Sequence, residues 1–177
     1  QTGGKWGTKW LLETMPERVT GDALLNGEPS GLNNVRFMEK GTVRVTIRVE
    51  APGGHGGYPH LTRNPNKVVA RIITELDERL HGRESPLPPE AARHLLTPEG
   101  IAVANAGLGQ GASEWVKRLT FNPGVVRGGL KVNQIADVAE VECDFRVPMG
   151  IPRESVLEEV EAVCRAHDAT FTLTESH

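Results

Sequence analysis

The sequence predicts an α+β fold, a ferredoxin-like sandwich whose elements follow the order β-α-β-β-α-β. Two stretches, 42–50 and 137–147, alternate between apolar and polar residues, as half-buried strands do. Two others, 65–81 and 152–164, carry apolar residues at helical spacing. We therefore expect an antiparallel sheet with two helices on one of its faces.

The first strand, 42–50, places four aliphatic side chains on its buried face: Val43, Val45, Ile47 and Val49. After a glycine-rich turn, Asn64-Pro65 opens a helix that runs to about His81, and Gly82 ends it. Residues 83–114 are rich in Pro, Gly and Ala and show weak periodicity. This composition indicates an insertion in the pattern.

Regular structure resumes with short strands at 118–121 and 124–127, and breaks at Gly128-Gly129. The strand at 137–147 then turns one set of alternate side chains inward: Ala139, Val141, Cys143, Phe145 and Val147. Pro152 is suited to the first turn of the second helix. The buried stripe of that helix contains Val156, Leu157, Val160, Val163 and Cys164. A short strand at 170–174 completes the order.

Residues 1–36 do not fit this pattern. A short helix is expected at 6–12, and 22–26 resembles a strand with no partner among the other elements. We therefore expect two parts, 1–36 as a piece of another domain and 37–177 as the ferredoxin-like domain, together forming the middle of a longer polypeptide.

Composition excludes several classes of protein. A net charge of −3 and only 5% aromatic residues argue against nucleic-acid binding. No apolar run approaches about 18 residues, so no membrane span is expected. The opening residues lack a signal-peptide pattern. We expect a cytoplasmic protein, in a reducing compartment. Cys143 and Cys164 are expected to be small residues of the hydrophobic core.

His55 lies in a turn of four glycines, Gly53-Gly54-His55-Gly56-Gly57, that lets the backbone approach another molecule closely. Its imidazole could act on a ligand, or it could be an ordinary hydrogen-bonded surface residue. A metal pair with His60 is disfavoured by Pro59 and by the turn. The remaining histidines are expected to face solvent: His81, His94, His167 and His177.

Three further residues could carry chemistry. Glu28, in Gly-Glu-Pro-Ser-Gly, offers a hard oxygen ligand at a strand end, or is an exposed turn residue. Asn133 offers an amide that can hold a carbonyl or an oxyanion. Arg146 offers a planar fork for a carboxylate, or pairs with Glu142 or Asp144 on the sheet.

The joint order of these motifs is more specific than any one of them. The succession comprises Gly27-Glu28-Pro29-Ser30-Gly31, Lys40-Gly41, Gly54-His55-Gly56-Gly57-Tyr58-Pro59-His60, Gly128-Gly129, Val132-Asn133-Gln134-Ile135 and Asp144-Phe145-Arg146. It resembles the M20 metallopeptidase family of acetylornithine deacetylases, succinyl-diaminopimelate desuccinylases, aminoacylases and carboxypeptidases. The resemblance implies that 37–177 is the lid or dimerisation domain, and that 1–36 is a fragment of the zinc-dependent catalytic domain.

The resemblance also implies roles for the four candidate residues. Glu28 would bind one of two zinc ions, which activate water in the whole enzyme. His55 would reach across a homodimer and stabilise the oxyanion in the neighbouring active site. Asn133 and Arg146 would hold the substrate, an N-acyl amino acid or small peptide, with Arg146 on its carboxylate. This segment alone would be inactive and would hold no zinc.

Three departures from the family pattern accompany the resemblance. Gln1 stands where a metal-binding Glu is common, and the usual Asn-x-Ile-Pro is Asn133-Gln134-Ile135-Ala136. The His-x-Asp metal motif is absent from this sequence. The alternative is a stand-alone ferredoxin-like module for dimerisation or small-ligand binding, without catalysis. That alternative gives no reason for Glu28, His55 and Asn133 to occur in this order.

Overall fold

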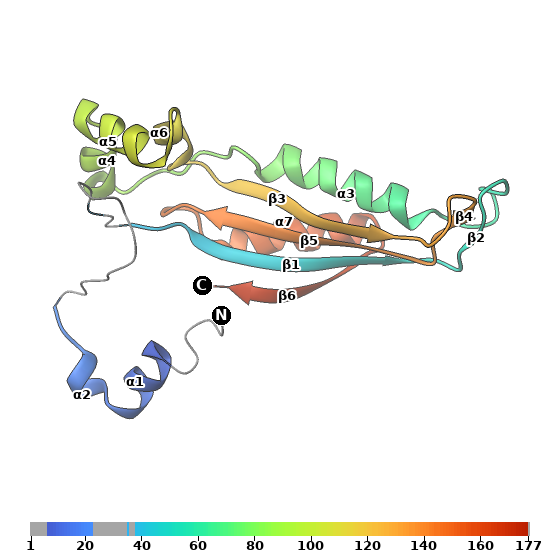
Figure 1. Cartoon of the computed structure of the whole chain (residues 1–177), viewed down its shortest axis with the longest axis horizontal. Coiled ribbons are helices and arrows are strands. Elements are labelled where there is room, and N and C mark those ends of the chain that lie inside the picture. The colour runs from blue at the N-terminus through green and yellow to red at the C-terminus, as the bar shows by residue number, and fades with distance from the viewer. Residues whose placement is uncertain (1–6, 23–34, 36–37, 177) are drawn as a thin grey trace. The chain divides into compact units, whose positions relative to one another are not determined.

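The computed structural model describes residues 7–22, 35 and 38–176 (Figure 1). Glu28, Gln1 and nearly all of the predicted strand at 22–26 lie outside the described residues. The chain divides into two compact units, Gln1–Leu32 and Asn33–His177. In the first unit the expected helix forms as α1 (Thr8–Thr14), and α2 (Pro16–Val19) follows it.

The second unit is built on a four-stranded antiparallel sheet in the order β3-β5-β1-β6. This is the strand order that a split β-α-β arrangement produces, so the predicted ferredoxin-like sheet is confirmed. The strands are β1 (Gly41–Glu50), β3 (Thr120–Gly128), β5 (Val138–Val147) and β6 (Thr170–Ser176). A separate pair, β2 (Gly54–His55) and β4 (Gln134–Ile135), lies beyond the end of the main sheet (Figure 1).

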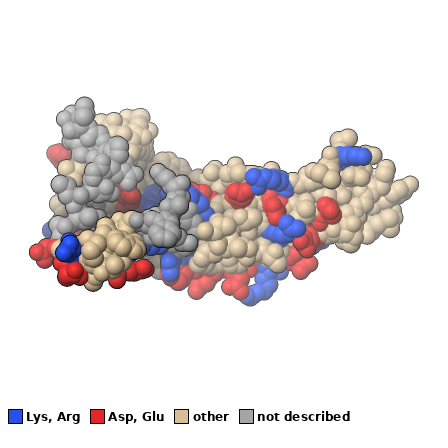
Figure 2. All heavy atoms as spheres, turned by 60° about the horizontal axis from the view of Figure 1, so that its bottom comes forward, with Lys and Arg blue, Asp and Glu red and all other residues tan. Residues whose placement is uncertain are grey.

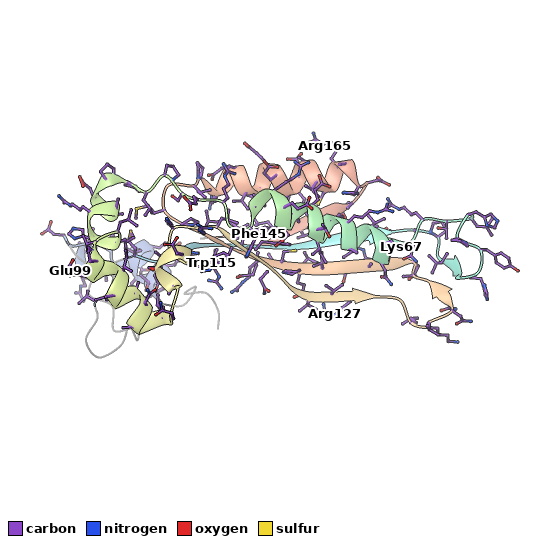
Figure 3. The ribbon with its side chains drawn as sticks, turned by 90° about the horizontal axis from the view of Figure 1, so that it is seen from above. Lys67, Glu99, Trp115, Arg127, Phe145 and Arg165 are labelled. Atoms are coloured by element: carbon purple, nitrogen blue, oxygen red, sulfur yellow. The ribbon has the colours of Figure 1, made fainter. Side chains whose placement is uncertain are left out.

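The two long helices, α3 (Pro65–Leu80) and α7 (Arg153–Ala166), run alongside each other and share one core with the sheet (Figure 3). Asn64 starts α3, because its side chain accepts hydrogen bonds from the N–H groups of Asn66 and Lys67. The core contains every predicted inward residue of β1 and β5, and Phe145 stacks on Phe121 within it. The predicted alternation is therefore confirmed.

The outward face of β1 and β5 is polar, and its charges are paired. Arg44 donates to Asp144, and Arg48 contacts Glu140 on the neighbouring strand. In Figure 2 acidic and basic side chains lie next to one another along the middle of the face shown. This pairing stabilises the register of the two strands, because opposite charges stand across from each other.

Three details differ from the expected elements. Residues 83–114 form the helices α4 (Pro89–Leu95), α5 (Pro98–Leu108) and α6 (Ala112–Trp115), which weak periodicity did not predict. The two short strands at 118–127 are one strand, β3, with a register shift between Pro123 and Val125. Proline is tolerated there because β3 is an edge strand. Pro152 lies one residue before the first turn of α7, at the N-cap position, and its side chain makes no capping hydrogen bond.

Both cysteines are buried and free, as predicted. Burial raises the pKa of each thiol, that of Cys164 to about 11, so neither is an activated nucleophile. Among the described residues, no helix has the length and apolar character needed to cross a bilayer.

Candidate functional site

The candidate site lies at the end of the sheet where β1 stops and β5 begins. We call the loops there, 51–64 and 129–137, the tip. Gly53 leaves β1 with a φ of +69°, a backbone conformation that glycine adopts without strain. Two backbone contacts then join the loops, because His55 pairs with Gln134, and the N–H of Gly56 donates to the carbonyl of Asn133 at 2.8 Å. Two of the predicted site residues, far apart in sequence, are thus neighbours.

The His55 side chain is exposed, and its own loop determines its tautomer. The N–H of Gly57 donates to Nδ1 of His55 at 3.1 Å. A ring nitrogen that accepts a hydrogen bond carries no proton, so in the neutral imidazole this contact favours the tautomer with its proton on Nε2. A Cβ atom on Gly57 would lie only 3.2 Å from Nδ1. Glycine at 57 therefore makes room for this arrangement.

Arg63 fixes the tip to the rest of the domain. Its guanidinium donates to the carbonyl of Glu50 through Nε at 3.1 Å and Nη2 at 2.8 Å. It also donates to the carbonyls of His167 and Asp168, at the turn between α7 and β6. One side chain thus ties the His55 loop to the end of β1 and to a second layer of the fold.

Arg146 lies at the opposite end of the sheet. It pairs with Thr42 of β1, eight residues before the end of that strand at Glu50. At the rise of an antiparallel strand, this places Arg146 about 27 Å from the start of the tip. The structure therefore brings His55 and Asn133 together and separates Arg146 from both.

Arg146 is held by two side chains. Its Nε donates to Asp144 at 2.8 Å and its Nη1 to the hydroxyl of Thr42 at 2.9 Å. Partial burial favours a higher pKa for Asp144, but hydrogen bonds and charges from Arg44 and Arg146 outweigh it and lower that pKa. The ion pair with Asp144, one of the two expectations for Arg146, is thus present.

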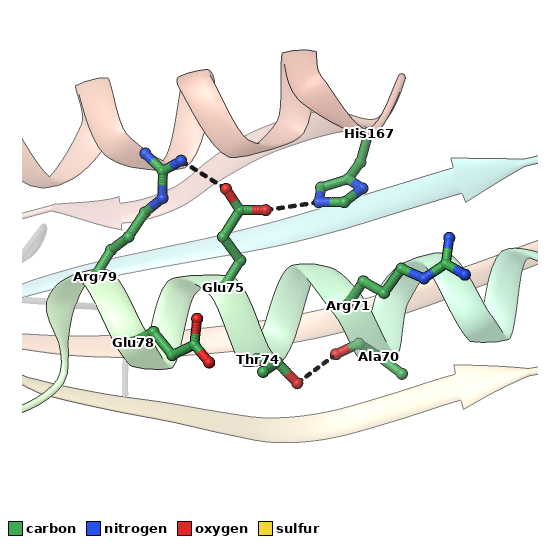
Figure 4. Close-up of a pocket in the computed structure, with 7 residues that line it drawn as sticks. All are labelled: Ala70, Arg71, Thr74, Glu75, Glu78, Arg79 and His167. Atoms are coloured by element: carbon green, nitrogen blue, oxygen red, sulfur yellow. Dashed lines mark hydrogen bonds and ion pairs between the residues drawn. The ribbon is translucent and has the colours of Figure 1, made fainter.

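Two hollows on the described surface are lined by residues of α3. One, of about 450 Å³, lies beside the tip and is lined by Arg63, Lys67 and Arg71 together with Gly56, Gln134 and six others. The second, of about 640 Å³, lies along α3 (Figure 4). There Glu75 sits 2.7 Å from His167. His167 is half-buried and paired, so the expectation that it faces solvent was wrong.

Within residues 7–22, 35 and 38–176, no three His, Cys, Asp or Glu side chains come together in a way that could hold a metal ion. Glu28, the predicted zinc ligand, is outside these ranges. The described part of the chain therefore does not fit a zinc site by itself.

The sequence did not indicate the residues that hold His55 and Arg146 in place. Arg63 follows the tip motif without a spacing signal, and Thr42 lies on a strand whose pairing partner is unknown from sequence. Gly57 stands two residues after His55, which is the local signal that could have indicated a contact with Nδ1.

A family model described as a peptidase dimerisation domain matches residues 37–172. A succinyl-diaminopimelate desuccinylase of Paracoccus denitrificans is 31% identical over 170 residues, which cover 87% of this chain and 42% of that protein. A probable carboxypeptidase of Paracoccidioides brasiliensis is 30% identical over 132 residues, covering 75% of this chain and 25% of that protein. The chain thus spans less than half of the length of these relatives.

Among solved structures, an M20 family metallo-carboxypeptidase from Sulfolobus solfataricus shares the fold with a TM-score of 0.56 at 17% identity. The match covers 75% of this chain and 37% of that one. The family match, which spans most of the second unit, and the shared fold agree with each other. The chain belongs to the M20 peptidase dimerisation domain family.

Proposed function

We propose that this chain is the lid segment of a metal-dependent amidohydrolase or peptidase that hydrolyses an amide bond of an N-acyl amino acid or small peptide. Residues 37–177 would be the lid and dimerisation domain, and 1–36 a fragment of the catalytic domain. Family membership supports the proposal, as do the names of the related desuccinylase and carboxypeptidase.

The observation that carries the proposal is the hydrogen bond from Gly57 to Nδ1 of His55. With Nδ1 accepting from Gly57, the exposed Nε2–H is available to donate a hydrogen bond. Hydrolysis of an amide passes through a tetrahedral intermediate with a negative oxygen, and a fixed donor stabilises that oxygen more than the ground-state carbonyl. The carbonyl of Asn133 accepts a hydrogen bond from Gly56 in the same loop, so the Asn133 side chain would hold the substrate beside His55.

The separation of Arg146 from the tip fits a homodimer in which each lid serves two active sites. We infer that His55 and Asn133 enter the neighbouring subunit's site, while Arg146 binds the substrate carboxylate at the other end of the lid. Asp144 and Thr42 would orient the guanidinium so that its remaining N–H groups meet that carboxylate.

Two zinc ions remain part of the proposal for the whole enzyme, with Glu28 as one ligand. When bound, they would polarise the amide carbonyl and supply a reactive water. His55, Asn133 and Arg146 would orient the substrate and stabilise the oxyanion but would not activate water. The isolated segment is therefore expected to be inactive.

The substitution His55→Ala in the full-length enzyme tests this role. We expect kcat to fall by about 10²–10³, because one oxyanion donor is removed. Metal content, measured by elemental analysis, should stay unchanged, since His55 is not a proposed ligand.

His60→Ala is the matched control, because His60 is a second exposed imidazole in the same loop and has no proposed role. It should leave kcat nearly unchanged. A loss below about threefold for His55→Ala would contradict the assignment. The chain would then be better described as a dimerisation module without a catalytic residue.

A further inference from the structure

Helix α5 has the sequence of a buried helix but is exposed. Its eleven residues contain one charge, Glu99, and no charged residue occurs from Gly100 to Ser113. Helices that are apolar on all sides are normally buried in the core of a larger assembly. Yet α5 has no buried residue, and Leu108 is 62% and Val103 48% exposed.

The apolar surface extends beyond α5 itself. Large apolar side chains of the neighbouring segments are also exposed, and together with α5 they form what we call the α5 surface: Leu96, Ile101, Val103, Leu108 and Trp115. Exposed apolar side chains concentrated on one short helix and the segments beside it mark a site of contact with another part of a protein.

The α5 surface is fixed at one end of the lid. Two backbone hydrogen bonds join the chain before α4 to the chain after α6. The N–H of Gly82 donates to the carbonyl of Leu119, and the N–H of Ser85 donates to the carbonyl of Lys117, both at 2.8 Å. Lys40, directly before β1, donates to the carbonyl of Arg118 at 2.5 Å. In Figure 3, Glu99 and Trp115 lie at this end, and Lys67 lies toward the tip.

The same end is where the main sheet connects to other parts of the chain. β1 begins there at Gly41, and β6 ends there, because Ser176 pairs with Val43. Chain that follows β6 would therefore leave the second unit at the end that carries the α5 surface. The related desuccinylase is more than twice as long as the matched region, so the proposed parent has enough additional chain to cover it.

We propose that the α5 surface is the docking face for the catalytic domain of the same polypeptide. This inference rests on the proposed function. A second copy is a poorer occupant, because the proposed partner contact is made by the tip, which lies at the other end of β1. The contact would fix the lid against its own catalytic domain and so set the position of Arg146, which is at this end as well.

Hydrogen exchange of the full-length parent, compared with the 177-residue chain, tests the proposal. Amides of α5 from 102 to 108 should exchange at least about tenfold more slowly in the parent, at every protein concentration. Equal rates would overturn the proposal. Protection that disappears when the parent is diluted to monomers would overturn it too, because a second copy would then be the occupant.

A substitution gives an independent readout. Val103→Glu in the parent should lower Tm by several degrees, since it places a charge in a covered apolar contact. Arg93→Glu is the control, because it adds the same residue at an exposed site on α4. It removes only an exposed ion pair with Glu90, so it should change Tm little. Equal shifts for the two variants would contradict the proposal.

Amide hydrolysis by the wild-type parent is measured in parallel. If α5 is protected in an inactive parent, the docking face stands and only the proposed function fails. If the parent is active and α5 exchanges freely, the proposed function stands and only the docking face fails.

Discussion

At the scale of single residues, the side chains with proposed roles are set by neighbours that sequence motifs do not identify. The sequence predicted that His55 would be presented by a glycine turn, and it is exposed. It could not predict the tautomer, because that depends on the 3.1 Å contact from Gly57 to Nδ1. Likewise, the Asp-Phe-Arg motif predicted a sheet-face arginine but not the hydroxyl of Thr42 that holds it.

The substitution Gly57→Ala tests this control of His55. The new Cβ would lie 3.2 Å from Nδ1 and 3.3 Å from Cε1, so the ring must move and the selection of one tautomer should weaken. Nitrogen NMR of the 177-residue chain at about pH 8.5, where an ordinary imidazole is neutral, reports the tautomer directly. We expect one tautomer, protonated on Nε2, in the wild type and a mixture in the variant.

Gly54→Ala is the control, because its Cβ would meet only Thr62 at an ordinary 3.4 Å. It should keep the wild-type pattern. A wild-type spectrum with the proton on Nδ1 would contradict the proposed donor.

At the scale of elements, alternation predicted β1 and β5, and helical spacing predicted α3 and α7. The helices of segment 83–114 were not predicted, because α4 and α6 are short and α5 contains only one charged residue. α5 consists mainly of small and apolar residues, so its pattern lacks the period that marks an amphipathic helix. The predicted strands at 118–121 and 124–127 are one strand, because an edge strand accommodates Pro123 with a register shift.

The contact between α3 and the end of α7 predicts a pH dependence of stability. The hydrogen bond with His167, and then that from Arg79, lower the pKa of Glu75 (Figure 4). A carboxyl whose folded pKa is depressed contributes stability above its unfolded pKa, about 4.3, and loses it as pH falls through the folded value. Glu75→Gln should therefore lose less stability than the wild type between about pH 6 and pH 3.

Urea unfolding at the two pH values measures this difference. Glu78→Gln is the control, because Glu78 lies on the same helix and lines the same hollow. The contacts that lower the pKa of Glu75, from His167 and Arg79, are made to Glu75 itself. It should resemble the wild type. If Glu75→Gln and Glu78→Gln lose the same amount, the contact between Glu75 and His167 does not stabilise the fold.

At the scale of the whole molecule, the two ends of the lid have different proposed partners. The tip carries His55 and Asn133, and the far end carries Arg146 and the α5 surface, about 27 Å away along β1. The sequence motifs grouped Asn133 and Arg146 as substrate contacts without this separation, because most of the positions between them belong to the extended strand β5, whose length a motif does not display. Under the proposed function, one lid would therefore contact two substrates, and each active site would draw on two copies of the chain.

Mixing two inactive variants of the full-length enzyme tests this account most directly. His55→Ala lacks the proposed donor, and Glu28→Ala lacks a proposed metal ligand. In a mixed dimer, the intact metal site of the His55→Ala subunit would receive His55 from its partner. Equal mixing should therefore restore about a quarter of wild-type activity, since half of the dimers are mixed and each has one working site of two. No recovery, with mixed dimers verified by mass, would contradict action across the dimer.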